Sequence, residues 1–284
     1  MKLTQHETVA EFLEAAGGGL EAEESLNNLI LGITWNLTNG RYAGTAPPVL
    51  MTVAGSGGLE AAMAMTNPPQ IVLLYAPGQD AQQTLAQVAD ALLARGTEVR
   101  GCMAPVATVK AFTNLWTQRT GRKATLHKAL RIHELRRVLP LASVPGRLRV
   151  ATMGDVDLAA DWRHRFNLEA IGESDAAGAR SAVERNIAAG DLFFWDDGGR
   201  PVCQAVAARR TRKGISIGAV YTPPEFRSRG YATACVAALS QHQLDAGCQF
   251  CCLYTDLANP TSNSIYRNIG YVPVADADEY RFDG

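Results

Sequence analysis

The stretch that decides the fold is YTPPEFRSRGYATA, residues 221–234. It follows GISIGAVY (214–221), which is typical of a strand, and it runs into an apolar segment that is typical of a helix. Arg227 and Arg229 therefore stand immediately before an expected helix N-terminus. The first amides of a helix have no partner inside the helix and attract anions. Two arginines at such a place predict a local phosphate-binding turn.

Composition limits what this turn belongs to. The chain has 284 residues and 47% apolar residues, which suits one large domain or two ordinary ones. Its 27 basic and 28 acidic residues give a net charge of −1. Broad nucleic-acid binding depends on clustered positive charge, so we expect no nucleic-acid partner.

We also expect no membrane function. The opening MKLTQHETVAEFLEAAGGG is interrupted by acids, unlike a secretion signal. No apolar run reaches the roughly 18 uncharged residues that a bilayer span requires. These features predict a cytoplasmic protein.

Four of the six cysteines fall in the last third of the chain, and three of them lie in CQFCCLYT, 248–255. No second CxxC or HxxxH accompanies them, so a zinc site lacks its other ligands. Cysteine also serves as a small apolar residue in a core. We predict a buried strand here and no metal.

A rough internal repeat organises the chain. The pattern strand, helix, strand occurs at 70–105 and again at 214–256, with each helix closed by a glycine, Gly96 and Gly247. Between the copies, PLASVPGR (140–147) is the best linker because it carries two prolines and a glycine. We predict two tandem domains, residues 1–143 and 144–284.

Two motifs in the second copy stand in a meaningful order. RSRGYA (227–232) fits [RQ]-x-x-G-x-[GA], in which small residues let backbone amides approach a ligand. Downstream, DLANPTSNSIYRNIGY (256–271) fits N-x-x-S-x-x-x-Y-x-x-x-G-[FY], and its Tyr266 stands in the central position. With both motifs in sequence, residues 147–284 resemble the GNAT superfamily of acyl-CoA-dependent N-acetyltransferases.

The resemblance implies a fold and a cosubstrate. The fold is α/β with a mixed α+β sheet, in two tandem GNAT-like domains whose central twisted sheets are flanked by helices, and RLRVATMGDVDLAADW and EYRF look like the opening and closing segments of the second domain. The cosubstrate is acetyl-CoA, with its pyrophosphate on the turn and its pantetheine arm along the preceding strand. The positions that match the binding motifs are Val220, Tyr221, Thr222, Arg227, Ser228, Arg229, Gly230, Tyr231, Ala232, Thr233, Asn259, Ser262 and Asn263.

Acyl transfer to an amine needs a neutral amine, a stabilised oxyanion and a proton for the departing thiolate. Tyr266 stands where the family keeps the proton donor, although an aromatic residue there also suits packing. GISIGAVY carries no carboxylate, which departs from many family members and leaves the base open. Glu169 and Asp256 are candidates for the base, beside a water relay or an amine that is already partly deprotonated. Asn259 and Asn263 also suit helix caps.

The resulting hypothesis is an enzyme, an acetyl-CoA-dependent N-acetyltransferase acting as a monomer or homodimer, with Tyr266 as general acid and Glu169 as a possible base. An alternative is a non-catalytic acetyl-CoA-binding regulatory module. A third is an N-terminal half that binds a separate partner. The acceptor stays open among a small amine, an amino acid, an aminoglycoside-like antibiotic and a protein N-terminus or lysine.

The first copy has PGQDA, with Asp80 and no arginine, at the equivalent turn, so we interpret residues 1–143 as a degenerate copy without cofactor.

Overall fold

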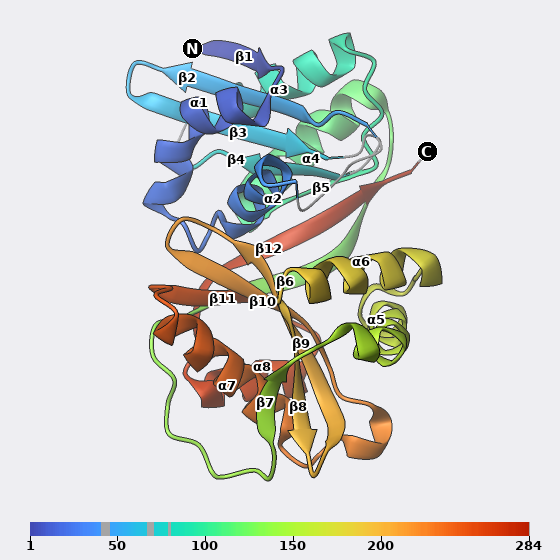
Figure 1. The fold of residues 1–284 in the computed structure, drawn as a ribbon. Coiled ribbons are helices and arrows are strands. Elements are labelled where there is room, and N and C mark those ends of the chain that lie inside the picture. Colours follow the sequence, from blue (N-terminus) through green and yellow to red (C-terminus); the bar gives the residue numbers. More distant parts are fainter. Residues whose placement is uncertain (41–45, 67–70, 79–80, 284) are drawn as a thin grey trace. The chain divides into compact units, whose positions relative to one another are not determined.

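The computed structural model describes residues 1–40, 46–66, 71–78 and 81–283 of the chain (Figure 1). Asp80 lies outside these residues. The chain forms two compact units, which divide after Ile132. The first unit also takes in Thr255–Ala258 and the C-terminal segment from Pro273, while Asn259–Val272 belongs to the second.

Both copies of the repeat have the same order of elements, strand, two helices, three strands, helix, strand, helix, strand. The first copy comprises β1 (Lys2–His6), α1 (Val9–Ala22), α2 (Asn28–Thr38), β2 (Val49–Gly55), β3 (Gly58–Met65), β4 (Ile71–Tyr75), α3 (Ala81–Ala94), β5 (Gly101–Pro105), α4 (Val106–Thr120) and β6 (Ala124–Leu135). The second comprises β7 (Arg147–Val150), α5 (Val156–Ile171), α6 (Ala176–Ala188), β8 (Leu192–Asp197), β9 (Arg200–Arg210), β10 (Gly214–Tyr221), α7 (Tyr231–Asp245), β11 (Phe250–Asp256), α8 (Pro260–Ile269) and β12 (Val272–Phe282), with short 3₁₀ turns at Met153–Asp155 and Pro224–Phe226. The predicted tandem α/β organisation is confirmed.

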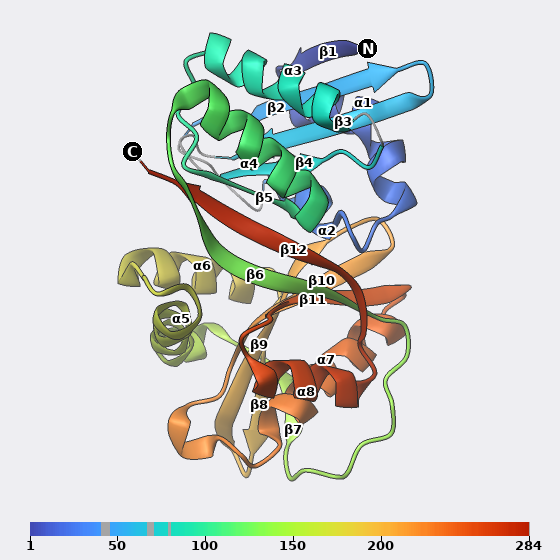
Figure 2. The same cartoon turned by 180° about the vertical axis from the view of Figure 1, so that it is seen from behind.

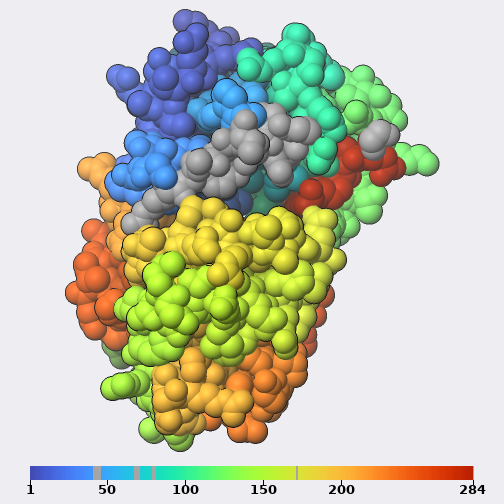
Figure 3. All heavy atoms as spheres, turned by 45° about the vertical axis from the view of Figure 1, so that its right-hand side comes forward, coloured from blue at the N-terminus to red at the C-terminus, as the bar shows by residue number. Residues whose placement is uncertain are grey.

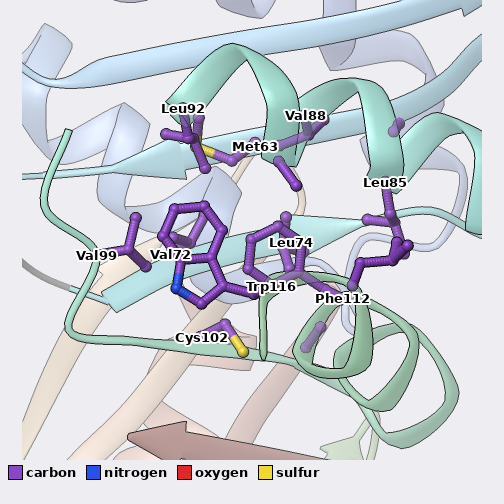
Figure 4. Close-up of a cluster of buried hydrophobic side chains, with 14 of the residues drawn as sticks. Met63, Val72, Leu74, Leu85, Val88, Leu92, Val99, Cys102, Phe112 and Trp116 are labelled. Carbon is purple, nitrogen blue, oxygen red and sulfur yellow. The ribbon is translucent and has the colours of Figure 1, made fainter. Parts of the chain in front are cut away.

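The first unit is a sheet covered by helices on both faces. Its strands follow the order β1-β2-β3-β4-β5-β12-β6, with β6 belonging to this unit as far as Ile132, and β4 and β5 pair in parallel. Helices α3 and α4 cover one face, as Figure 2 shows, and α1 and α2 lie on the other. Leu85, Val88 and Leu92 recur at helical spacing on α3 and are fully buried against Trp116 of α4, in the core drawn in Figure 4.

The closing strand β12 pairs in the first unit, where our expectation had placed it in the second copy. Its residues 277–281 pair antiparallel with β5, from Ala277↔Pro105 to Arg281↔Gly101. A Cβ at Gly101 would collide with the carbonyl oxygen of Tyr280, so glycine permits this close approach. The sequence pattern of a strand does not indicate which strand it pairs with. The pairing of β12 with β5 could therefore not be predicted.

The second unit has the strand order β11-β10-β9-β8-β7, with β10 and β11 parallel and the other pairs antiparallel. Helix α7 packs Cys235 and Leu239 against one face of this sheet, and α5 packs Trp162 against the other. All six cysteines are buried thiols that form no disulfide, and β11 is the buried cysteine-containing strand that the sequence predicts. In the described part of the chain, no helix combines the length and apolar character of a membrane span.

An ion-pair network fixes the start of the second copy. The Arg149 guanidinium donates to Asp155 at 2.8 and 2.9 Å and to Asp196 at 3.1 Å, tying β7 to the turn before α5 and to β8. Hydrogen bonds from Arg149 lower the pKa of Asp155 from 3.8 to about 2, and the backbone N–H of Thr152 contributes. The Asp155 side chain is only 15% exposed, so solvent screens this pair weakly.

Replacing Asp155 with asparagine should lower the free energy of unfolding by about 1–2 kcal/mol at pH 7, since one pKa unit corresponds to about 1.4 kcal/mol. Because the folded pKa is depressed, the stabilisation is present above pH 3.8 and is lost as pH falls towards 2. Urea denaturation of both proteins between pH 3 and pH 7 measures the difference. Asp157→Asn, whose side chain is 90% exposed, is the matched control and should change little. A difference that does not narrow at low pH would contradict this account.

Candidate active site

The last residues of β10 form a bulge. The ladder between β9 and β10 pairs Gly218 with Val206 and then Tyr221 with Gln204, so two residues of β10 lie opposite one residue of β9. Ala219, inside the bulge, has a φ of 50°, which is unusual for a residue with a side chain. A bulge bends its strand and releases backbone groups from the ladder. These groups are available to a ligand.

The bulge coincides with the end of the pairing between β10 and β11. Over the described residues, that parallel ladder runs from Gly214↔Phe250 to Ser216↔Cys252, while β10 continues to Tyr221. The backbone of β10 beyond Ser216 is therefore a free edge on this side. An extended ligand arm can pair with such an edge as an added strand does.

The turn after β10 leads to the unpaired amides at the start of α7. Phe226 anchors it in the core, whereas residues 227–230 are exposed. Ser228 has a φ of 62° and Gly230 a φ of 81°, and a Cβ at Gly230 would lie 3.1 Å from Val144. Helix α7 begins at Tyr231, and the N–H of Ala234 donates to the carbonyl of Gly230 at 3.0 Å. The three amides before Ala234 thus stand at the helix start without an intrahelical acceptor, in the arrangement that binds phosphate.

Arg227 lies at this turn, where it contacts a predicted catalytic residue. Its Nη2 atom donates to Glu169 of α5 at 2.7 and 3.0 Å, and its Nε donates to the Thr222 carbonyl at 2.9 Å. The Tyr221 hydroxyl lies 3.4 Å from Glu169, and burial followed by the Glu169 charge raises the Tyr221 pKa. Glu169 is therefore placed beside the turn and is engaged there by a cation.

Tyr266 of α8 faces the apolar cluster under α7. Its ring meets the ring of Tyr271 edge to face, with 5.8 Å between centroids. Burial, followed by the nearby thiols of Cys203 and Cys235, raises the pKa of Tyr266 well above 10. The hydroxyl consequently keeps its proton throughout the neutral range and can donate a hydrogen bond to a negatively charged ligand atom.

The other residues of the downstream motif shape the start of α8. The Asn259 side chain accepts from the Ser262 N–H at 3.0 Å, and Asn263 donates to the Asn259 carbonyl at 2.8 Å. Asn259 is thus a helix cap, which a ligand contact does not exclude. Asp256 accepts from the N–H of Ala258 at 2.7 Å in a segment that groups with the first unit.

The remaining predicted positions are distributed around the turn. Tyr231 packs its ring in the core and donates its hydroxyl to Asp197 at 2.6 Å. Val220 belongs to the bulge, and Arg229 is exposed in the turn. Ala232 and Thr233 follow Tyr231 in the first turn of α7. No group of three or more His, Cys, Asp or Glu side chains suited to a metal ion occurs among the residues that the structure describes.

Sequence reasoning missed Gln204, which pairs with Tyr221 and whose two amide atoms are buried without a hydrogen-bond partner. The hydroxyl of Thr222, a predicted position, is likewise buried without a partner. A buried polar group without a partner in a folded protein is usually explained by a bound ligand, a bound water molecule or local strain. The alternation of residues along β9 was the signal that could have indicated Gln204.

The comparisons agree with this geometry. Residues 199–281 match the family described as FR47-like protein. The fold is similar to an acetyltransferase of the GNAT family from Colwellia psychrerythraea (13% identity, TM-score 0.59, 99% of each chain covered). It is also similar to a GCN5-related N-acetyltransferase from Sphaerobacter thermophilus (16% identity, TM-score 0.62, 98% of this chain and 95% of that one covered). A third similar structure is a tandem GNAT protein from the clavulanic acid biosynthesis pathway. It is 13% identical, with a TM-score of 0.57, and the match covers 99% of this chain and 98% of that one. No curated protein matches in sequence.

The chain therefore has the fold of the GNAT acetyltransferases in two tandem copies, and its second copy carries the FR47-like region. The predicted GNAT-like fold and its tandem organisation are confirmed. The boundary at residues 143 and 144 and the individual site residues stay predictions.

Proposed function

We propose that the protein is an acetyl-CoA-dependent N-acetyltransferase whose second copy is catalytic. The observation that carries the proposal is the combination of a bulged, unpaired β10 edge with an exposed turn of free amides and Arg227 directly after it. The edge suits a pantetheine arm with amide groups, and the turn suits a pyrophosphate. Together they define the two ends of a CoA site.

The reaction follows from this placement. The acceptor nitrogen attacks the thioester carbonyl carbon, the tetrahedral oxyanion collapses, and the C–S bond breaks. As general acid, Tyr266 donates its hydroxyl hydrogen to the leaving sulfur while the C–S bond breaks. Because the raised pKa of the tyrosine lies above the ordinary thiol pKa of about 8.5, this transfer is uphill by itself, and it is completed when solvent returns a proton to the tyrosinate. The hydrogen bond from Tyr266 to the sulfur strengthens as negative charge develops there, so it stabilises the transition state more than the ground state.

Glu169 is proposed to act at the pyrophosphate end of the site, away from the thioester. A base must reach the amine proton directly or through one water. Its contacts with Arg227 and Tyr221 favour a role at the phosphate turn, where it holds Arg227 in position until a pyrophosphate competes for the guanidinium. Proton removal from the amine by Glu169 stays a prediction, beside removal by water.

One acetyl-CoA should bind per chain and stabilise the protein by mass action. At a ligand concentration of 100 times Kd, the free energy of unfolding should rise by about 2.7 kcal/mol. Calorimetric titration of the full chain measures the stoichiometry, and thiol release with a panel of amines measures turnover. Two acetyl-CoA molecules bound per chain would contradict the interpretation that the first copy has lost its cofactor site. Binding without thiol release from any amine would favour the regulatory module instead.

A further inference from the structure

The exposed part of the turn after β10 has a buried residue on each side. Residues 227–230 are exposed, whereas Phe226 before them and Tyr231 after them belong to one apolar cluster. Within the exposed stretch Ser228 has a φ of 62°, a backbone conformation that costs free energy for a residue with a side chain. Such a conformation persists only where the surrounding structure fixes it. The contacts of Phe226 and Tyr231 therefore decide the shape of the turn.

Both flanking residues contact the end of the β8–β9 hairpin. The Tyr231 hydroxyl donates to the Asp197 carboxylate at 2.6 Å, and the guanidinium carbon of Arg200 lies 4.6 Å from the centroid of the Phe226 ring. Asp197 and Arg200 are register partners in this hairpin. In Figure 3 the hairpin end, in gold, and the turn, in orange, lie side by side at the lower edge of the view. One hairpin end thus holds the turn from both sides.

The hairpin end is itself firmly fixed. Gly198 and Gly199 have φ values of 61° and 85°, as the tight turn that best suits the twist of two paired strands requires. The Gly199 N–H donates to the Asp196 carboxylate at 2.8 Å, and Arg149 of β7 donates to the same carboxylate at 3.1 Å. The support behind the turn is therefore formed before any ligand binds.

We propose that Asp197 is a positioning residue for acetyl-CoA. Through the Tyr231 hydroxyl it fixes the first residue of α7, and so it holds the unpaired amides of residues 231–233 where the pyrophosphate binds. A hydrogen bond to a carboxylate is about twice as strong as one between neutral groups, which suits this task. The proposal rests on the proposed function and adds to it a residue that acts without touching the ligand.

The charge of Asp197 gives the proposal a distinctive sign. A carboxylate near a pyrophosphate repels it, so an Asp197 that acted only through its charge would weaken binding, and its removal would tighten binding. An Asp197 that positions Tyr231 has the opposite effect, because its removal loosens the start of α7 and the ligand must then order it. The two accounts predict opposite changes in affinity for Asp197→Ala.

Calorimetric titration of the full chain with acetyl-CoA measures this change. We expect Asp197→Ala and Tyr231→Phe each to raise Kd about tenfold, and the double variant to raise it no further, since both remove one hydrogen bond. Asp197→Asn keeps an acceptor for the hydroxyl and should keep most of the affinity. Tyr271→Phe removes a 2.8 Å hydroxyl bond to Ser240, farther along α7, and should leave Kd unchanged. Unchanged or tighter binding in Asp197→Ala would overturn the proposal.

The two halves of CoA separate positioning of the turn from general loosening of the unit. The nucleotide half, 3′-phospho-ADP, carries the pyrophosphate, and pantetheine carries the arm that pairs with β10. Ligand-observed NMR titration should show that Asp197→Ala weakens the nucleotide half by about the same factor as acetyl-CoA and leaves pantetheine binding unchanged. Equal weakening of both halves would show a merely structural role and overturn the proposal. If the natural protein binds acetyl-CoA and every variant binds it equally well, only this proposal fails, whereas a natural protein that binds neither acetyl-CoA nor 3′-phospho-ADP rejects the proposed function as well.

Discussion

Replacing Tyr266 with phenylalanine is expected to lower kcat by about 10²- to 10⁴-fold and to leave acetyl-CoA affinity nearly unchanged. The hydroxyl matters only when the thiolate departs, so its removal affects the transition state and spares ground-state binding. Steady-state kinetics and calorimetric titration on the same preparation separate the two quantities. Because burial raises the Tyr266 pKa above its ordinary 10, this group keeps its proton as pH rises. The rate should therefore show no loss from Tyr266 ionisation below pH 10.

Tyr271→Phe is the matched control for this prediction. Tyr271 lies against Tyr266 in the same cluster and shares a 2.8 Å hydrogen bond with the Ser240 hydroxyl. Its loss should reduce stability by about 1 kcal/mol without a comparable fall in kcat. If both variants lose rate and stability in parallel, Tyr266 is a packing residue.

Reversing the charge of Arg227 is expected to weaken acetyl-CoA binding by about 100-fold. A hydrogen bond between charged groups contributes about 1.5–3 kcal/mol, and 2.8 kcal/mol corresponds to a factor of about 100. Arg227→Glu removes the donor and also sets a second carboxylate beside Glu169, so repulsion adds to the loss. Calorimetric titration with acetyl-CoA measures the change.

Arg147→Glu makes the same charge change at an exposed position of the edge strand β7 and should leave binding intact. Glu169→Gln adds a second control, because it frees Arg227 and removes the competing carboxylate. It should bind acetyl-CoA as tightly as the natural protein or more tightly. Unchanged affinity in Arg227→Glu would move the pyrophosphate away from this turn.

The turn and the helix after it could be predicted from the sequence because their determinants are local. Small residues, a positive-φ glycine and a helix start all fall within ten residues, from Thr222 to Tyr231. The repeat was also visible, since each copy keeps its own order of apolar runs. Buried Cys251 and Cys252 followed from the apolar character of one strand.

The contacts that shape the site could not be predicted, since they join residues far apart in the chain. Glu169 meets Arg227 across 58 positions, and each residue alone resembles a solvated surface charge. Gln204 likewise pairs with Tyr221, and not with Val220, only because β10 bulges after Gly218. A sequence pattern shows a strand's period but not the bulge that shifts it.

The pairing of β12 with β5 has a consequence for the order of events during synthesis. About 170 residues separate the partners, so a ribosome adding about 5–20 residues per second makes β12 roughly 10–30 s after β5. Throughout that interval the nascent first unit exposes the edge of β5, a row of unpaired backbone groups prone to pair with another chain. The first unit, whose own copy is made first, is therefore completed only when β12 of the second copy has left the ribosome.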